Sequence, residues 1–579
     1  MVWVHSPWYN FCMWSKLLLL FFVFSFLFKT DHSFDQDLGR HLKLGEIIWQ
    51  TKQVPQVNLF SYTNPTFPFI NTHWLFEVMS YLSSQTVGLQ TLLFIKIIIF
   101  LAAVYLILRI IPNDNKALLL PTGFIFLHVL RERTELRPEI FSFFFTALTL
   151  LMLEKFLAFR QISSDCGTFV SNIKLIFLLP LIQLIWVNTH IYFFIGLGLQ
   201  AIFLIHLTYQ YLRFNLKGYK LKILGIIFVL SVLISLTNPN GVGGFLYPLN
   251  VTQNFGYTIV ENQTMFLLEN INFQDPNFLF VKLSLAIIAS ALIFAAIKRK
   301  LSIKNSLLAL AGVVLALINT RSFPYLVFLS FPAILQSLGQ IKPNSSTKIL
   351  TLIFSLLLLV ESFLYLNGEY YRRKNMDDSV NFKLVESGQK AMDFVISNNL
   401  PSPIFNNFDI GSYIIYRGFP KYQVFVDGRP EAYPKEFFQN IYIPVQSDTQ
   451  KFKELDQRIN FQTIIFSHTD QTPWGKAFLT SIVKDDNWKT VYLDDFMIVL
   501  VKNEVVQQKN LKPVDLSALN PGSYSFNSSL SYLKLSLFLL QTQNQQSAKK
   551  FAEKGLAIFP GSPLGNALFG VTTTNHIFW

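Results

Sequence analysis

The stretch KLLLLFFVFSFLFKTDHSFDQDLGRHLKLGEII (residues 16–48) decides the fold class. Residues 17–28 are apolar apart from Ser25, and a polar segment with several acids follows directly. The apolar run is as short as the core of a signal peptide, but no cleavage site of small residues follows it in KTDHSFDQD. We therefore predict a retained membrane anchor near residues 10–28, with a polar loop beyond it.

The composition indicates a membrane protein. Hydrophobic side chains make up 51% of the chain, charged ones only 14%, and the mean hydropathy is +0.38. Soluble proteins carry about 25% charged residues. Apolar runs of nearly bilayer length predict spans at 10–28, 89–108, 117–130, 138–158, 175–187, 191–211, 221–237, 278–297, 305–320, 322–340 and 349–367. The predicted fold class is therefore mainly α, a polytopic transmembrane helical protein of about 11 spans.

Basic residues predict the orientation. They recur in alternate loops, for example Arg109 with Lys116 and Lys298 with Lys304, whereas residues 237–278 contain no Lys or Arg. Basic loops stay in the cytoplasm. We therefore expect a multi-pass protein of the cytoplasmic membrane with a cytoplasmic N-terminus and an extracytoplasmic C-terminal part. The same bias explains the net charge of +13 without a nucleic acid partner.

The chain is predicted to have three parts. Residues 1–367 form the transmembrane domain, with a long first outer loop at 29–88. Residues 368–513 alternate short β-like runs with helix-like stretches, which is typical of an α/β domain. Residues 514–579 contain a helical hairpin, at 526–541 and 545–558, that resembles part of a tetratricopeptide repeat and is a candidate surface for a protein partner. Cys12 and Cys166 fall in or near the cytoplasm, so we expect neither a disulfide framework nor a thiolate metal cluster.

The first outer loop supplies the candidate catalytic residues. Asp37 and His41 are four residues apart and share one face of a predicted amphipathic helix on the outer membrane interface, and Asp35 stands at its start. One aspartate could be a general base, or the two could hold Mg²⁺ or Mn²⁺ with His41. The alternative is that Asp35 caps the helix and Asp37 complements the helix dipole.

Other outer connections supply candidate substrate-binding residues. His73 and Glu77 precede an apolar helix, where an interfacial anchor or a helix cap would also explain them. His190 joins two spans almost without a loop, as either an interhelical hydrogen-bonding group or a site residue. Several arginines oppose the topological preference and so need an anion, either a protein carboxylate or a lipid phosphate: Arg131, Arg133, Arg137 and Arg321. In VFVDGRPEAYP (424–434), a tight turn with an Asp427–Arg429 pair is the simplest explanation.

These features together resemble the GT-C superfamily of membrane glycosyltransferases: a first span from the cytoplasm, a long outer loop with paired acids, about a dozen spans and a terminal outer domain. The stretch DQDLGRHLKLGEIIWQTKQVPQVNLFSYTNPTFPFINTHWLFEV (35–78) also resembles the first loop of a poorly characterised bacterial branch of that superfamily. The resemblance covers residues 10–367, and VFVDGRPEAYP beyond them.

The resemblance implies transfer of a sugar from a polyprenyl-phosphate-linked donor to a glycan, lipid or protein acceptor on the outer face. It implies a base or metal-ligand role for Asp35 or Asp37, and a phosphate-binding role for the four outer arginines. The chain has no WWDYG-type motif, which argues against transfer of a whole oligosaccharide to asparagine. It also has no Gly-rich phosphate loop, so no nucleotide cofactor is expected.

Two other functions fit the sequence. A lipid-linked saccharide flippase or transporter would need polar residues along a path through the membrane, whereas here they gather on one side. A non-catalytic membrane scaffold for envelope proteins would need no deep cavity behind the first loop.

Overall fold

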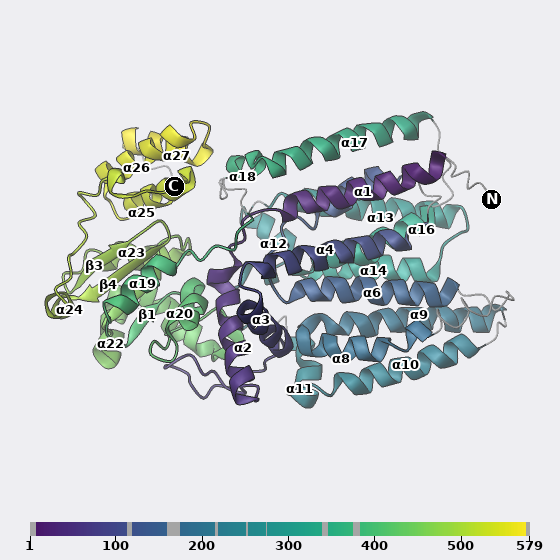
Figure 1. The fold of residues 1–579 in the computed structure, drawn as a ribbon, viewed down its shortest axis with the longest axis horizontal. Helices are drawn as coiled ribbons and strands as arrows, with labels where there is room; N and C mark the ends of the chain where they lie inside the picture. The colour runs from purple at the N-terminus through teal and green to yellow at the C-terminus, as the bar shows by residue number, and fades with distance from the viewer. Residues whose placement is uncertain are drawn as a thin grey trace.

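The structure is a computed structural model that describes residues 7–112, 118–158, 174–214, 218–250, 253–273, 275–338, 345–374 and 382–574. A bundle of long, roughly parallel helices occupies one end of the molecule, and a domain containing a β-sheet occupies the other (Figure 1). Two helices of the first loop, α2 (Gly39–Thr51) and α3 (Trp74–Thr86), lie between these parts. Lys116 and Cys166, which entered the topology prediction, lie outside the described residues.

Each predicted span contains helix, because the apolar runs satisfy their backbone hydrogen bonds internally. The bundle helices are α1 (Pro7–Leu27), α4 (Thr91–Ile110), α5 (Leu119–His128), α6 (Glu139–Ala158), α8 (Leu179–Thr189), α9 (Phe194–Phe214), α10 (Tyr219–Ser235), α13 (Asn277–Ile297), α14 (Ile303–Ile318), α16 (Phe331–Leu338) and α17 (Ser345–Leu366). Within the described residues, five helical segments are long and apolar enough to cross a membrane: Thr91–Ile110, Glu139–Ala158, Ile191–Phe214, Asn277–Ile297 and Ser345–Leu366. The other spans and the orientation of the chain stay predictions.

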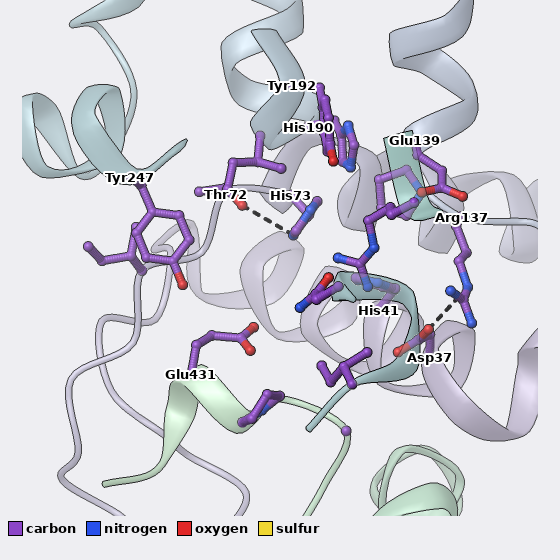
Figure 2. Close-up of a pocket in the computed structure, with 18 of the residues that line it drawn as sticks. Asp37, His41, Thr72, His73, Arg137, Glu139, His190, Tyr192, Tyr247 and Glu431 are labelled. Carbon is purple, nitrogen blue, oxygen red and sulfur yellow. Dashed lines mark hydrogen bonds and ion pairs between the residues drawn. The ribbon is translucent and has the colours of Figure 1, made fainter. Parts of the chain in front are cut away.

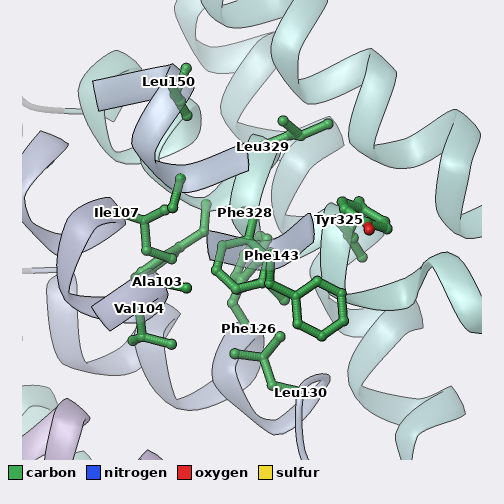
Figure 3. Packing of buried hydrophobic residues seen from close by; sticks show 14 of the residues in the cluster. Ala103, Val104, Ile107, Phe126, Leu130, Phe143, Leu150, Tyr325, Phe328 and Leu329 are labelled. Atoms are coloured by element: carbon green, nitrogen blue, oxygen red, sulfur yellow. The ribbon is translucent and has the colours of Figure 1, made fainter. Parts of the chain in front are cut away.

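Aromatic and branched side chains fill the bundle core (Figure 3). Phe143 of α6 stacks on Phe328 with ring centroids 5.5 Å apart, and Ile107 and Phe126 are fully buried. Outward-facing side chains are also apolar, because Leu212 and Phe363 are 76% and 66% exposed. An apolar core inside an apolar surface is what a bilayer requires of a helical bundle.

The first loop is fixed by a buried ion pair. Asp31 and Lys96 of α4 are 2.7 Å apart and each is 1% exposed, and Asp31 also accepts a hydrogen bond from the Leu136 backbone. A π-helical turn, η1 (Phe34–Leu38), then leads into α2. That this helix lies on the membrane surface stays a prediction. Leu42 is buried in a cluster shared with α20 (Gly411–Gly418) of the C-terminal domain, whereas Trp49, near the end of α2, is 46% exposed.

The C-terminal part contains a four-stranded mixed sheet in the order β1–β2–β4–β3. Its strands are β1 (Ile404–Asn406), β2 (Thr463–Ser467), β3 (Trp488–Leu493) and β4 (Met497–Lys502). β1 and β2 are parallel, with Ile404 opposite Thr463, and the other pairs are antiparallel. The sequence predicts five strands, and the runs at 403–407, 462–467, 490–494 and 497–502 form four of them. The fifth, YQVFVDGR (422–429), forms only an isolated bridge from Val424 to Ser61, because its backbone pairs with the first loop rather than with the sheet.

Helices surround this sheet: α19 (Gln389–Ser397), α20, α22 (Thr449–Ile459) and α23 (Pro473–Ile482). The predicted hairpin is α25 (Ser529–Gln541) and α26 (Gln545–Ile558), and an additional helix, α27 (Pro563–Thr574), follows it. Phe538 and Phe551 of the hairpin belong to the same buried cluster as Phe466 of β2. The hairpin therefore shares a core with the sheet, and its resemblance to a tetratricopeptide repeat stays a prediction.

Candidate functional site

A cavity of about 150 Å³ lies where the bundle meets the C-terminal domain. Its walls come from the first loop, the start of α6, the connection between α8 and α9, the segment after α11 (Gly241–Leu246) and a turn at residues 428–431 (Figure 2). The predicted site residues that line it are Asp37, His41, His73, Arg137, His190 and Arg321. The predicted site residues that do not line it are Asp35, Glu77, Arg131 and Arg133.

Asp37 is held by two arginines. Its Oδ2 lies 3.2 Å from Arg137 Nε, and its Oδ1 accepts a hydrogen bond of 3.4 Å from Arg40 Nη2. Burial acts to raise the pKa of Asp37, but the charges of Arg137 and then Arg40 outweigh it and lower that pKa. Asp37 is therefore an ionised group that orients both guanidinium groups in the cavity.

Asp35 has a structural role in this arrangement. Its carboxylate oxygens accept hydrogen bonds from the backbone amides of Ser387 and Gly388, at 3.1 and 3.2 Å. Gly388 immediately precedes α19, so Asp35 caps a helix of the C-terminal domain. Burial raises the pKa of Asp35 to about 6, although these hydrogen bonds oppose the shift. The sequence anticipated a cap, but for the helix that follows Asp35 rather than for α19.

The two aspartates do not fit the divalent-cation site that the sequence suggested. Both Asp35 oxygens accept backbone hydrogen bonds, and Asp37 is flanked by cations. Over the described ranges, no three His, Cys, Asp or Glu side chains are grouped so that they could hold a metal ion. Mg²⁺ and Mn²⁺ need several oxygen ligands around one point. The residues present therefore do not fit such an ion.

His41 is oriented by a buried carboxylate. Its Nδ1 lies 2.9 Å from Glu77 Oε1, and Asn71 donates a 2.6 Å hydrogen bond to Glu77 Oε2. Gly45 makes this possible, because a Cβ at that position would lie 2.1 Å from the Glu77 carbonyl oxygen. Burial and then the charge of Arg40 hold the pKa of His41 well below its usual range. Glu77 thus positions a neutral imidazole instead of contacting the cavity itself.

Two further histidines continue this wall. The ring of His73 lies 5.7 Å from that of His41 and 5.4 Å from that of His190, measured between centroids. His190 Nδ1 is 2.7 Å from Ser142 Oγ. Burial and then His41 lower the pKa of His73 to about 3. The three imidazoles form an uncharged, hydrogen-bonding side of the cavity.

An arginine cluster forms another side of the cavity. The carboxylate of Glu261 is shared by Arg133, Arg137 and Arg321, at 2.8, 3.0 and 3.1 Å. Arg321 Nε has no hydrogen-bond partner among the described residues. A guanidinium has five N–H donors, so Arg321 can bind an anion in addition to Glu261. Arg133, the third arginine of the cluster, does not line the cavity.

Arg131 belongs to the same sequence motif but is directed elsewhere. Its guanidinium pairs with Glu132 at 2.9 Å and donates hydrogen bonds to Tyr365 and Asn277 at 3.0 and 3.3 Å. These contacts tie the loop after α5 to α17 and α13. Of the two anions that the sequence left open for Arg131, the structure thus shows a protein carboxylate, and the geometry does not support a phosphate-binding role for it.

Sequence reasoning missed several cavity residues: Arg40, Glu139, Tyr192, Tyr247 and Glu431. Arg40 lies three residues after Asp37, and Glu139 two residues after Arg137, so this spacing was an available signal. Glu431 follows the Asp427–Arg429 turn, but no sequence pattern indicated that this turn faces the membrane domain.

Comparison with known proteins gives structural matches only. No protein-family model matches the sequence, and no curated protein matches it. The archaeal oligosaccharyltransferase AglB from Archaeoglobus fulgidus, in complex with an inhibitory peptide and a dolichol-phosphate, aligns with a TM-score of 0.55 at 11% identity. That alignment covers 96% of this chain and 86% of AglB.

Two other structures of the A. fulgidus oligosaccharyltransferase also align. The form tethered to an acceptor peptide gives a TM-score of 0.56 at 12% identity, over 85% of this chain and 73% of that one. The complex with Zn and sulfate gives 0.53 at 9% identity, over 95% and 86%. At such identities the likeness concerns the fold alone. The chain therefore has the fold of the GT-C membrane glycosyltransferases.

Proposed function

We propose that the chain moves a sugar from a polyprenyl-phosphate-linked donor to a hydroxyl-bearing acceptor, on the extracytoplasmic face of the membrane. The observation that carries this proposal is that Arg137, Arg321 and Asp37 line one cavity at the end of the helical bundle. A polyprenyl phosphate keeps its tail in lipid and its charged head at the interface. Its enzyme needs cations at the end of a bundle, and the arginine cluster supplies them.

The arginines suit the chemistry of such a donor. When the bond between the sugar C1 and the phosphate oxygen breaks, the leaving phosphate gains negative charge. Preoriented guanidinium groups stabilise that charge as it develops. Arg321 has donors free for this purpose, and Arg137 is oriented by Asp37. The neutral histidine wall offers hydrogen bonds to sugar hydroxyls without adding charge.

The structural neighbours support the donor class. AglB was solved with a dolichol-phosphate, which is a polyprenyl phosphate, and with a peptide. The neighbour that holds Zn and sulfate lends no metal to this proposal, because the first-loop aspartates here do not fit a cation. The missing WWDYG-type motif argues against an asparagine acceptor, so we propose a hydroxyl of a glycan, lipid or protein.

The alternatives receive less support. A scaffold does not require a cavity that joins Asp37 of the first loop to Arg137 of the α5–α6 loop, which form an ion pair of 3.2 Å. A flippase requires polar groups along the bundle, whereas the cavity residues gather where the bundle meets the C-terminal domain.

The test uses purified protein in nanodiscs and radiolabelled polyprenyl-phosphate sugars. We expect release of polyprenyl phosphate and appearance of a labelled product. Asp37→Asn should impair transfer, because it frees Arg137, while Asp35→Asn should retain transfer per folded molecule, because Asp35 lies outside the cavity. The proposal fails if the wild-type protein neither binds polyprenyl phosphate nor releases it from any donor.

A further inference from the structure

The segment VFVDGRPEAYP (424–434) brings the C-terminal domain into the cavity. Asp427 and Arg429 form a two-pronged ion pair, Nε to Oδ1 at 2.7 Å and Nη2 to Oδ2 at 2.8 Å, with both side chains almost completely buried. The Tyr433 hydroxyl donates a 3.0 Å hydrogen bond to Asp427 Oδ2. A buried charge pair with its remaining donors satisfied fixes a single conformation of the turn that it closes.

The first outer loop holds the same turn from the other side. Arg429 Nη2 donates to Asn58 Oδ1 at 2.8 Å, and Asn58 Nδ2 donates to the Ala432 carbonyl oxygen at 3.0 Å. The guanidinium also lies over the rings of Phe60 and Phe69, at 5.3 and 4.6 Å. The turn is therefore anchored to the loop that carries Asp37 and His41, and the two segments together form one wall of the cavity.

This turn presents Glu431. Its side chain lines the cavity, and no other residue among those described makes an ion pair or hydrogen bond with its carboxylate, which accepts a hydrogen bond from its own backbone amide. Figure 2 shows the carboxylate directed into the cavity, on the side opposite Glu139 and Arg137, with the Tyr247 hydroxyl nearby. Burial raises the pKa of Glu431, although its own backbone amide, then Arg40 and Arg429, act in the opposite direction.

The other cavity carboxylates are less suited to take a proton. Asp37 is paired with Arg137 and Arg40, which lower its pKa and with it the basicity of the carboxylate. Glu139 is likewise without an ion pair or hydrogen bond to another described residue, but it lies with Arg137 on the side assigned to the donor phosphate, away from the acceptor side. Glu431 thus stands at the wall opposite the phosphate site, with the cavity between them.

We propose that Glu431 is the catalytic base of the transfer reaction and that it marks the acceptor side of the cavity. This inference rests on the proposed function. The acceptor hydroxyl gives its proton to the Glu431 carboxylate while its oxygen forms a bond to the sugar C1. The bond from C1 to the donor phosphate breaks, and the phosphate leaves with the electron pair on the arginine side. Glu431 then releases its proton to water.

The closing experiment compares Glu431→Gln with Glu454→Gln, a matched change at an exposed carboxylate of the same domain. Both proteins are assayed in nanodiscs for binding of polyprenyl phosphate and for transfer from the labelled donor that the wild-type protein consumes. For Glu431→Gln we expect donor affinity within about threefold of wild type and transfer lowered by roughly 100-fold or more, since a positioned general base contributes about 10²–10⁴-fold. Glu454→Gln should match the wild type in both measurements.

The pH profile separates a base from a merely structural residue. The charged groups that act on Glu431 are Arg40, Arg429 and Asp427, and Tyr247 lies nearby. The pKa of Asp427 is lowered and those of Arg429 and Tyr247 are raised, so none of these three changes charge near neutral pH. The wild-type transfer rate should fall as the medium is acidified and Glu431 becomes protonated, and Glu431→Gln should lose that limb. Glu431→Asp should recover part of the rate.

Each outcome decides between the two proposals. Transfer by Glu431→Gln within about threefold of wild type overturns the base role while the proposed function stands. Loss of donor binding in Glu431→Gln also overturns it, because the change would then act through the shape of the cavity. If the wild-type protein binds no polyprenyl phosphate, the proposed function fails, and the assignment of Glu431 fails with it.

Discussion

Replacing Arg137 by glutamine should weaken binding of polyprenyl phosphate by a predictable factor. The Arg137 side chain is 12% exposed and pairs with three carboxylates, Asp37, Glu135 and Glu261, at 3.2, 2.8 and 3.0 Å. A hydrogen bond to a charged group contributes about 1.5–3 kcal/mol. Since 1.4 kcal/mol corresponds to about tenfold in affinity, Arg137→Gln should raise the Kd by about 10- to 100-fold. The three carboxylates left without this partner would repel the phosphate and act in the same direction.

The assay is native mass spectrometry or equilibrium binding of polyprenyl phosphate in nanodiscs of neutral lipid. Arg131→Gln is the matched control, because Arg131 belongs to the same loop but pairs with Glu132 and Tyr365, away from the cavity. Its Kd should stay within about threefold of wild type, a difference below about 1 kcal/mol. Equal affinities for both variants, or an unchanged Kd for Arg137→Gln, would refute the assignment of the phosphate site.

Three further predictions concern stability. Burial raises the pKa of Asp35 from 3.8 to about 6, so between these values the folded chain holds a proton that the unfolded chain releases. The contribution of Asp35 to the free energy of unfolding should therefore decline as the pH rises from about 4 to 6. Asp35→Asn should flatten that part of the profile of thermal midpoints against pH. Lys96→Met should destabilise the protein by about 3–5 kcal/mol, since it leaves the Asp31 charge buried without its cation. Adding Asp31→Asn to this variant should restore much of the lost stability. Thermal unfolding of the single and the double variant measures both effects. Gly45→Ala should destabilise the protein by about 1–3 kcal/mol and reduce transfer, because its Cβ would lie 2.1 Å from the Glu77 carbonyl oxygen and push α2 away from α3. An unchanged midpoint of thermal unfolding would contradict the close packing of these helices.

The candidate site shows how far local patterns reach. The spacing of Asp37 and His41 indicated that both face one side of a helix, and both line the cavity. The same pattern treated Asp35 as an equal partner, yet its carboxylate binds backbone amides at Ser387 and Gly388. Sequence periodicity gives the face of a helix, but it carries no information about a segment some 350 residues away that packs there. For the same reason Arg131, Arg133 and Arg137, which are close together in the sequence, contact different sets of partners.

The sequence by itself determined the helical membrane fold, because runs of apolar residues can satisfy their backbone hydrogen bonds in lipid only as helices. It also determined most strands of the C-terminal sheet, through short runs of β-branched residues. Only the tertiary structure decided which polar residues meet. The packing of the C-terminal domain against α2 brings Glu431 to the cavity and withdraws Asp35 from it. These contacts join segments hundreds of residues apart, and their geometry follows from how the buried surfaces fit together rather than from any local pattern.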